Sequence, residues 1–262
     1  MNFFKEQFAN TDKILYLSRI DLVKTYKGTH LGWFWSIFNP TFKIFVYYFT
    51  LIVGLKSSKI IFGYPYFLWL IAGLIPWFFI KDILNIGSEC IRQYNYLVTK
   101  INFPVSIIPT FCTLSKFYLH IFLMLIVFAI FIFSKSLTIY VIQLPIYIFL
   151  MLIFFYFLCL FLSTLSAISK DFYNFVKTTM FAIFWLSGII WDIAKMPEFV
   201  RYILYLNPVT FIVNGYRNCF IKHIWFFEEP IALLSFLGLT ILVAVSGIAL
   251  YNHLKKDIPD LL

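Results

Sequence analysis

The sequence predicts an all-α integral membrane protein in which six helices cross the bilayer as a single domain. Hydrophobic residues make up 62% of the 262 residues and charged residues 13%, against about a quarter charged in a typical soluble domain. Mean hydropathy is +0.88. Crossing the roughly 30 Å hydrocarbon core takes about 20 helical residues. The stretches that meet this requirement are Leu31–Leu55, Pro65–Leu84, Pro104–Phe133, Ile139–Ile168, Phe175–Trp191 and Ile231–Tyr251.

Residues 1–30, which precede the first stretch, are too polar to span a membrane. Phe4, Phe8, Ile14 and Leu15 alternate with charged positions, as in a helix that lies in the plane of the interface. No apolar segment of a signal peptide precedes Leu31, so we expect this segment to be retained. An N-terminal amphipathic interface helix over 1–30 is therefore predicted, followed by spans 1 and 2 within 31–84.

Residues 85–103 form the next polar segment. Ile86, Ile91 and Leu97 are spaced among charged and amide residues, which favours an amphipathic helix that ends before Pro104. We expect a cytoplasmic coupling region here, built as one helix. Spans 3 to 5 then occupy 104–191.

Residues 192–230 are too interrupted to span but remain rich in apolar residues. Asn207-Pro208 divides the segment, and the residue before a proline is biased away from helical geometry. Two short outer re-entrant helices are therefore predicted. Residues 231–262 then hold span 6 and a cytoplasmic tail.

The distribution of Lys and Arg predicts the orientation of the chain. If the N-terminus is cytoplasmic, 12 of the 21 basic residues lie inside, and Lys43 and Lys116 lie within apolar stretches. Basic residues concentrate on the cytoplasmic side of a membrane protein, so we expect both termini inside a bacterial plasma membrane. The net charge of +9 then needs no nucleic-acid partner. The outer basic residues are Lys56, Lys59, Lys135, Lys195, Arg201, Arg217 and Lys222.

Several kinds of chemistry have no sequence signature. The stretches 121–133, 139–168 and 231–251 contain no Asp, Glu, Lys or Arg, whereas ion-coupled transporters keep such groups near the midplane. No glycine is followed by lysine, so a phosphate-binding loop is absent. Hydrolase motifs and metal-type cysteine spacings are also missing. We expect no catalytic site, metal or cofactor in this chain, and ATP-driven transport would need another chain.

Two segments resemble a known family. The run from Arg19 to Pro40, RIDLVKTYKGTHLGWFWSIFNP, resembles the entry into the first span of ABC-2 type permeases that export polysaccharides. Pro197 to Pro208, followed by Tyr216-Arg217, is similar to that family's pair of short outer helices. Within the family, Asn102 to Thr110 and the terminal Asp257 to Leu262 resemble teichoic acid translocation permeases of Gram-positive bacteria. Capsule and O-antigen permeases share the same overall sequence pattern.

The resemblance implies a homodimer with two copies of a separate ABC ATPase subunit, which binds ATP and Mg. It implies translocation of an undecaprenyl-diphosphate-linked glycopolymer from the inner to the outer leaflet. Wall teichoic acid is the first candidate for this polymer. Alternatives are a capsule or O-antigen polysaccharide, or a small lipid or drug. A membrane enzyme that modifies glycopolymers is a further rival, but only Glu228 and Glu229 offer it acidic residues side by side.

The same resemblance suggests two sets of functional residues. Sugar rings stack on aromatic side chains, which make up 22% of the chain, and arginine binds phosphate. For the residues proposed to couple to the ATPase, the alternative is that their segment is only a solvated connector. For the residues proposed to line the substrate path, the alternatives are packing of the aromatic side chains and an Arg201–Glu198 pair. The ATPase-coupling residues are Glu89, Arg92, Gln93, Tyr94, Asn95 and Lys100, with Arg19 and Lys24 from the interface helix. The substrate-path residues are Trp69, Trp77, Phe79, Tyr118, Arg201 and Arg217.

Overall fold

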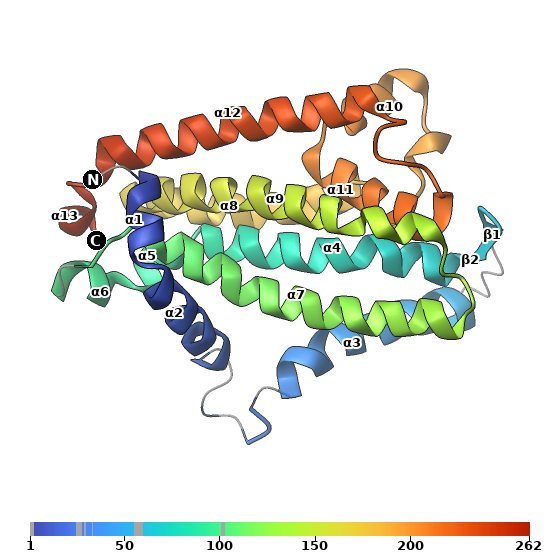
Figure 1. Ribbon diagram of the computed structural model, residues 1–262, viewed down its shortest axis with the longest axis horizontal. Coiled ribbons are helices and arrows are strands. Elements are labelled where there is room, and N and C mark those ends of the chain that lie inside the picture. The colour runs from blue at the N-terminus through green and yellow to red at the C-terminus, as the bar shows by residue number, and fades with distance from the viewer. Residues whose placement is uncertain (1–2, 25–27, 29, 33, 55–59, 101–102) are drawn as a thin grey trace.

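The computed structural model describes residues 3–24, 28, 30–32, 34–54, 60–100 and 103–262. Its long helices run along one axis, and both chain termini lie at the same end of the bundle (Figure 1). We call this the terminal end, and we call the opposite end, which carries a small β-hairpin, the hairpin end. Some residues of the motifs, span ends and basic positions discussed above lie outside the described residues: Tyr26, Lys27, Trp33, Leu55, Lys56, Lys59 and Asn102.

Within the described residues, four helical segments are long and apolar enough to cross a membrane. Two of the six predicted spans form shorter helices. The first is α3 (Phe34–Tyr48), 15 residues long and continued by the π-helix η1 (Phe49–Gly54), and the fifth is α9 (Lys170–Leu186), with 17 residues. Six crossings therefore stay a prediction. The four candidate spans are α4 (Tyr66–Gly87), α7 (Ile107–Phe133), the 3₁₀-helix η2 (Ile139–Gln143) with α8 (Leu144–Ile168), and α12 (Pro230–Leu254).

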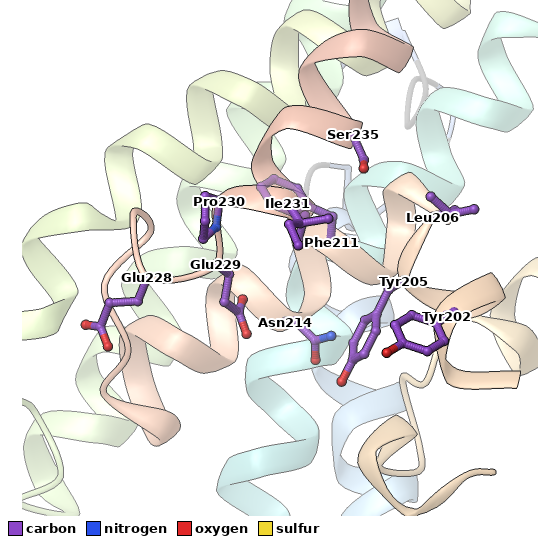
Figure 2. Close-up of a pocket in the computed structure, with 11 residues that line it drawn as sticks. Tyr202, Tyr205, Leu206, Phe211, Asn214, Glu228, Glu229, Pro230, Ile231 and Ser235 are labelled. Atoms are coloured by element: carbon purple, nitrogen blue, oxygen red, sulfur yellow. The ribbon is translucent and has the colours of Figure 1, made fainter. Parts of the chain in front are cut away.

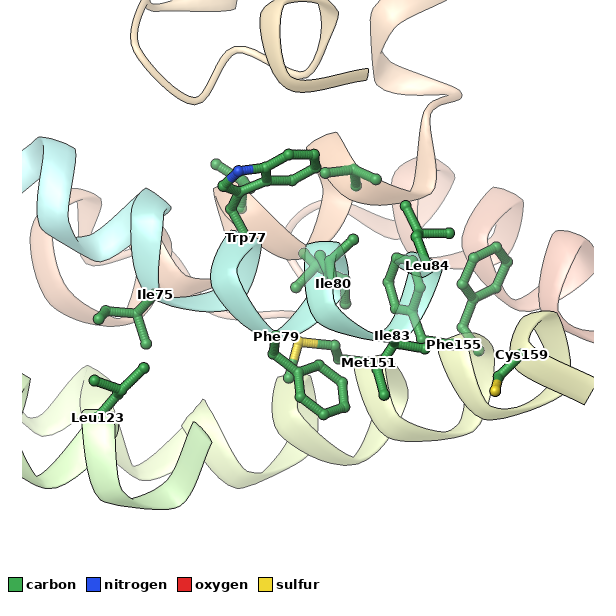
Figure 3. Close-up of a cluster of buried hydrophobic side chains, with 14 of the residues drawn as sticks. Ile75, Trp77, Phe79, Ile80, Ile83, Leu84, Leu123, Met151, Phe155 and Cys159 are labelled. Carbon is green, nitrogen blue, oxygen red and sulfur yellow. The ribbon is translucent and has the colours of Figure 1, made fainter. Parts of the chain in front are cut away.

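Helix α4 forms the centre of the bundle. In its most apolar window 83% of the residues are buried, against 17% in α12. Figure 3 shows Ile80 and Ile83 of α4 packed against Met151 and Phe155 of α8. The two helices approach closely at Gly87, where an added Cβ would lie 3.0 Å from the Cα of Cys159. A side chain there would push apart two backbones, so glycine sets this spacing.

The N-terminal segment forms two helices, α1 (Phe3–Ala9) and α2 (Thr11–Lys24), where one was predicted. The side chain of Asn10 donates to the carbonyl of Glu6 at 2.9 Å, a side-chain bond that competes with helical continuation. Helix α1 is held on the start of α7, because Gln7 Nε2 donates to the Ser106 carbonyl at 3.0 Å and Ser106 Oγ to Glu6 at 2.7 Å. Helix α2 packs along α7.

The prediction of one coupling helix was wrong. Helix α4 continues to Gly87, past the expected end of the span, and two short helices follow, α5 (Cys90–Gln93) and α6 (Asn95–Lys100). Ser88 Oγ donates to the Asn85 carbonyl at 2.7 Å, and Tyr94 separates α5 from α6 with φ −103° and ψ 24°. The apolar positions 83–98 keep the same spacing across both breaks, so their pattern could not reveal them.

The hairpin end holds two two-residue strands and a set of short helices. Strands β1 (Ile60–Ile61) and β2 (Tyr64–Pro65) pair antiparallel around Phe62 and Gly63, whose φ values of 52° and 81° fit a tight hairpin turn. This hairpin was not predicted. The short helices are the 3₁₀-helix η3 (Ile193–Lys195), α10 (Glu198–Tyr205), α11 (Pro208–Arg217) and the π-helix η4 (Asn218–Lys222).

The predicted break at Asn207-Pro208 is confirmed. The side-chain oxygen of Asn207 accepts from the Val209 amide at 2.9 Å, and Pro208 is the first residue of α11. Asparagine satisfies an otherwise unpaired amide at a helix start, and proline lacks the amide that would be unpaired there. At the terminal end, the last helix, α13 (Ile258–Leu261), packs against α6 and α8 through the buried Ile258.

Candidate functional site

At the terminal end, two of the predicted coupling residues meet around a buried carboxylate. Tyr94 donates its hydroxyl to Oδ1 of Asp21, and Nζ of Lys24 lies 4.5 Å from the centre of the Tyr94 ring. Burial, and then the hydrogen bond to Asp21, raise the pKa of Tyr94 far above its ordinary value, so the phenol stays a donor. These contacts join α2 to the junction of α5 and α6.

Arg92 joins the coupling region to the end of α8. Its Nε donates to the Ser166 carbonyl, and its Nη2 to the Ala167 carbonyl at 3.0 Å. The last carbonyls of a helix lack partners within the helix, and a cation also opposes the negative end of the helix dipole. Arg92 therefore fixes α5 to the C-terminus of a candidate span.

Asn95 performs a similar role at the start of α6. Its Nδ2 donates to the carbonyl of Leu262 at 3.2 Å, which ties the coupling region to the chain after α13. Glu89, Gln93 and Lys100 are instead exposed. The predicted residues of the coupling region thus divide into a docked group, which is hydrogen-bonded to the bundle, and an exposed group.

Arg19 also faces outward, on α2. With Lys24 and the apolar side chains of Tyr16, Ile20 and Val23 it lines an open groove of about 720 Å³. The basic and apolar side chains alternate on one surface, as they do in helices that lie at a membrane interface.

A polar cleft of about 480 Å³ opens beside the coupling region. Three carboxylates and two lysines meet there from α2, α4, α7, α9 and the start of α5. Oppositely charged groups can exchange partners at little cost when water still reaches them. The charged and amide residues that line the cleft are Asp21, Asp82, Asn85, Glu89, Gln93, Lys116 and Lys177.

At the hairpin end, Arg217 is fully buried, with 1% of its surface exposed. Its Nη1 and Nη2 donate to the carbonyls of Gly188 and Ile189 at 2.7 and 2.6 Å, and its Nε to that of Trp69 at 3.4 Å. The guanidinium also stacks on the Trp69 ring. The structure thus brings together two predicted substrate-path residues, and it surrounds both with protein.

The other predicted path residues lie apart. Trp77 and Phe79 of α4 are buried against Phe184 and His120, whereas Tyr118 is half-buried, its hydroxyl 3.3 Å from Ser18 Oγ. Arg201 is half-buried on α10. Its proposed pairing partner, Glu198, accepts from the Tyr202 hydroxyl at 3.2 Å. A path role for these residues stays a prediction.

Exposed aromatic side chains gather instead on α3 and η1. The rings of Phe34, Phe38 and Phe42 are stacked, with centroids 5.4 and 5.5 Å apart, and Phe45 and Phe49 continue the series at 6.4 and 6.3 Å. All five are at least 38% exposed. We call this series the aromatic ridge.

Polar side chains of α3 are also exposed. Asn39 and Lys43 are exposed beside the aromatic ridge, in the middle of the helix. Charged and amide groups at such positions face a partner or a water-filled space rather than lipid. The helix itself contacts α4 and α7 only sparsely.

The functional groups that the sequence did not predict are mainly hydrogen-bond acceptors. Asp21 lies within the Arg19 to Pro40 run, as the one acidic residue on the buried face of α2, which also holds Ile14 and Ser18. A buried carboxylate normally has a partner, so the amphipathic pattern indicated that Asp21 contacts another polar group. The carbonyls of Ser166, Ala167, Gly188 and Ile189 carry no signal, since every residue has one.

The comparisons with known proteins match nearly the whole chain. A family model described as ABC-2 type transporter matches residues 13–221. The O-antigen export system permease protein RfbA of Klebsiella pneumoniae is 27% identical over 255 residues, 96% of this chain and 95% of that protein. A permease of the same description from Myxococcus xanthus is 25% identical over 249 residues, 93% of this chain and 94% of that protein.

Proposed function

The chain belongs to the ABC-2 type transporter family, and we propose that its substrate is a lipid-linked cell-envelope polysaccharide. As the permease of an ABC-2 exporter it works with an ABC ATPase subunit. One observation carries the choice of substrate: O-antigen export permeases align with this chain over more than nine-tenths of both lengths. A polysaccharide of the O-antigen or capsule type is therefore the first candidate.

Wall teichoic acid is the second candidate. It is favoured by the segments Asn102 to Thr110 and Asp257 to Leu262, through which the sequence resembles teichoic acid permeases. Both polymers are built on undecaprenyl diphosphate, so the direction of transport, from the inner to the outer leaflet, is common to the two.

The complete transporter holds two copies of this chain and two ATPase subunits, which bind ATP and Mg. Both termini are cytoplasmic, and α3 and α9 complete six crossings. With η1, the helical segment that starts at α3 covers residues 34–54, long enough to cross the hydrocarbon core. The terminal end then faces the ATPase.

Coupling passes from α5 and α6 into the bundle. The exposed Glu89, Gln93 and Lys100 contact the ATPase, and the docked residues transmit its movement. Arg92 moves with the end of α8, and Tyr94 moves with α2. A rigid element between two helices of the bundle is suited to convert closure of an ATPase dimer into helix tilting.

The path for the polymer runs along the aromatic ridge of α3. Stacked phenylalanine rings offer the apolar C–H faces of sugars a continuous surface without strong binding sites. Asn39 and Lys43 beside the ridge face the same water-accessible space. Trp69, Trp77, Phe79 and Tyr118 would join this path only after α4 moves relative to its neighbours.

Depletion of the protein in its host tests the proposal. Polymer at the cell surface and polymer still attached to its lipid carrier are quantified separately during depletion. We expect surface polysaccharide to fall while the lipid-linked form accumulates inside. Unchanged surface polymer would contradict the proposal, and accumulation of a polyol phosphate polymer would favour teichoic acid.

A further inference from the structure

A pocket of about 330 Å³ lies at the hairpin end, between α10, α11 and the start of α12. None of the predicted functional residues lines it. Figure 2 shows Tyr202 and Tyr205 of α10 on one side, with Ile231 of α12 and Phe211 of α11 among the other lining residues. The volume lies at the lower end of the roughly 300–1,000 Å³ typical of small-molecule sites.

The polar part of the pocket is held in place by buried groups. Glu229 accepts from Nδ2 of Asn218 at 3.0 Å, and Asn218 is fully buried. The carboxylate of Glu229 and the amide of Asn214 are turned toward the same space (Figure 2). A carboxylate that is positioned from behind can accept hydrogen bonds from a ligand without losing further side-chain entropy.

Tyr205 lies close enough to this carboxylate to respond to it. Burial, and then the charge of Glu229, raise the pKa of Tyr205, while Arg201 opposes the shift. The phenol therefore stays protonated and can donate as well as accept a hydrogen bond. The pocket combines an aromatic wall with an amide, a hydroxyl and a carboxylate.

The charge of the pocket decides between possible ligands. Among the described residues that line it there is no lysine or arginine, while Glu228 and Glu229 supply two carboxylates. A phosphate or a carboxylate ligand would be repelled. A sugar ring offers what the pocket lacks, because its hydroxyl edge donates hydrogen bonds and its C–H face packs on tyrosine.

We propose that this pocket binds an uncharged sugar residue of the exported polymer as it leaves the membrane. The inference rests on the proposed function and narrows it, because a neutral polysaccharide fits the pocket and a polyol phosphate chain does not. Glu229 and Asn214 bind the sugar hydroxyls, and Tyr202 and Tyr205 pack against its face.

Photo-crosslinking in the host, during export of its own polymer, tests the inference. Leu206→p-benzoylphenylalanine places the reactive group in the pocket, and Phe199→p-benzoylphenylalanine is the control, since Phe199 lies on the same helix, is 70% exposed and does not line the pocket. Adducts are detected with a periodate-based glycan stain. We expect at least fivefold more stained adduct at position 206. Equal staining, or adducts of phospholipid mass without sugar, would overturn the inference.

A second pair of variants tests the role of the carboxylate. Glu229→Gln keeps an acceptor for Asn218 but removes the charge. Glu198→Gln is the control, because Glu198 is exposed on α10 and does not line the pocket. We expect several-fold less adduct at position 206 for Glu229→Gln only. Equal amounts of adduct in the two variants would show that the Glu229 carboxylate does not bind the sugar.

The two proposals fail in different ways. If depletion abolishes surface polymer but position 206 gives no glycan adduct, the pocket inference is wrong and the proposed function stands. If depletion leaves surface polymer unchanged, the proposed function itself is wrong.

Discussion

The guanidinium carbon of Arg217 lies 3.3 Å from the centre of the Trp69 ring. The same side chain binds the carbonyls of Trp69, Gly188 and Ile189, and the Tyr66 hydroxyl donates to the next carbonyl, that of Ile190. Arg217 thus joins α11 to α4 and to the segment after α9. The position of α11 relative to α4 and to that segment therefore depends on a buried cation.

Gly73→Ala should disturb this arrangement. An added Cβ would lie 2.6 Å from Nη2 of Arg217, whereas at Gly238, in α12, nothing lies within 4 Å. Overpacking a fixed group costs about 1–3 kcal/mol, so we expect a lower thermal unfolding temperature in detergent for Gly73→Ala. Gly238→Ala is the control and should be neutral or slightly stabilising. Equal unfolding temperatures would show that Arg217 moves freely.

Arg217→Lys should also destabilise the fold, although it keeps the charge. Lysine cannot reach three carbonyls with a planar fork or stack on Trp69 in the same way. We expect a loss of about 2–5 kcal/mol, measured as increased cleavage of the hairpin end by protease. Arg201→Lys, on the half-buried Arg201, should change cleavage little. Wild-type resistance of Arg217→Lys would contradict the structural role.

Tyr94→Phe should weaken the coupling of ATP hydrolysis to export. The change removes the donor to Asp21 but keeps the ring beneath Lys24. We expect normal membrane insertion and ATPase activity with less polymer exported per ATP. Tyr96→Phe, at a neighbouring residue that is 50% exposed, is the control. Equal export by both variants would show that the hydrogen bond between Tyr94 and Asp21 does not contribute to coupling.

Arg92→Ala tests the contact between the coupling region and α8. Without the guanidinium, the carbonyls of Ser166 and Ala167 lose their donors, which costs about 1–3 kcal/mol when such groups are buried. We expect inserted protein whose ATPase partner hydrolyses ATP without export. Lys256→Ala removes an exposed cation at the same end and should leave export unchanged. Export by Arg92→Ala at the wild-type rate would show that α5 acts without this contact.

Apolarity predicted the candidate spans because polar groups are costly in lipid, but it could not predict which span is central. Helix α4 has the lowest hydropathy of the four, 1.8, and is the most buried, whereas α12 has 2.5 and is the least buried. Lipid accepts only apolar side chains, while a protein neighbour also accepts glycine and polar groups. The most buried of the four candidate spans is therefore the least hydrophobic one.

Local signals were predicted better than distant contacts. The break at Asn207-Pro208 depends on adjacent residues and followed from the sequence. The partners of Arg217 lie 28, 29 and 148 residues away and are backbone carbonyls, so the sequence could identify a basic residue but not its burial. The same holds for Arg92, whose acceptors lie 74 and 75 residues away.

Reconstitution of the transporter tests whether this chain carries polymer across a membrane. The chain and its ATPase subunit are placed in proteoliposomes with lipid-linked polysaccharide from the host, and a glycosidase that cannot cross the membrane reports which side the polymer occupies. We expect the polymer to change sides only when ATP and both subunits are present. Rapid ATP hydrolysis with no movement of the polymer, or movement without ATP, would contradict it.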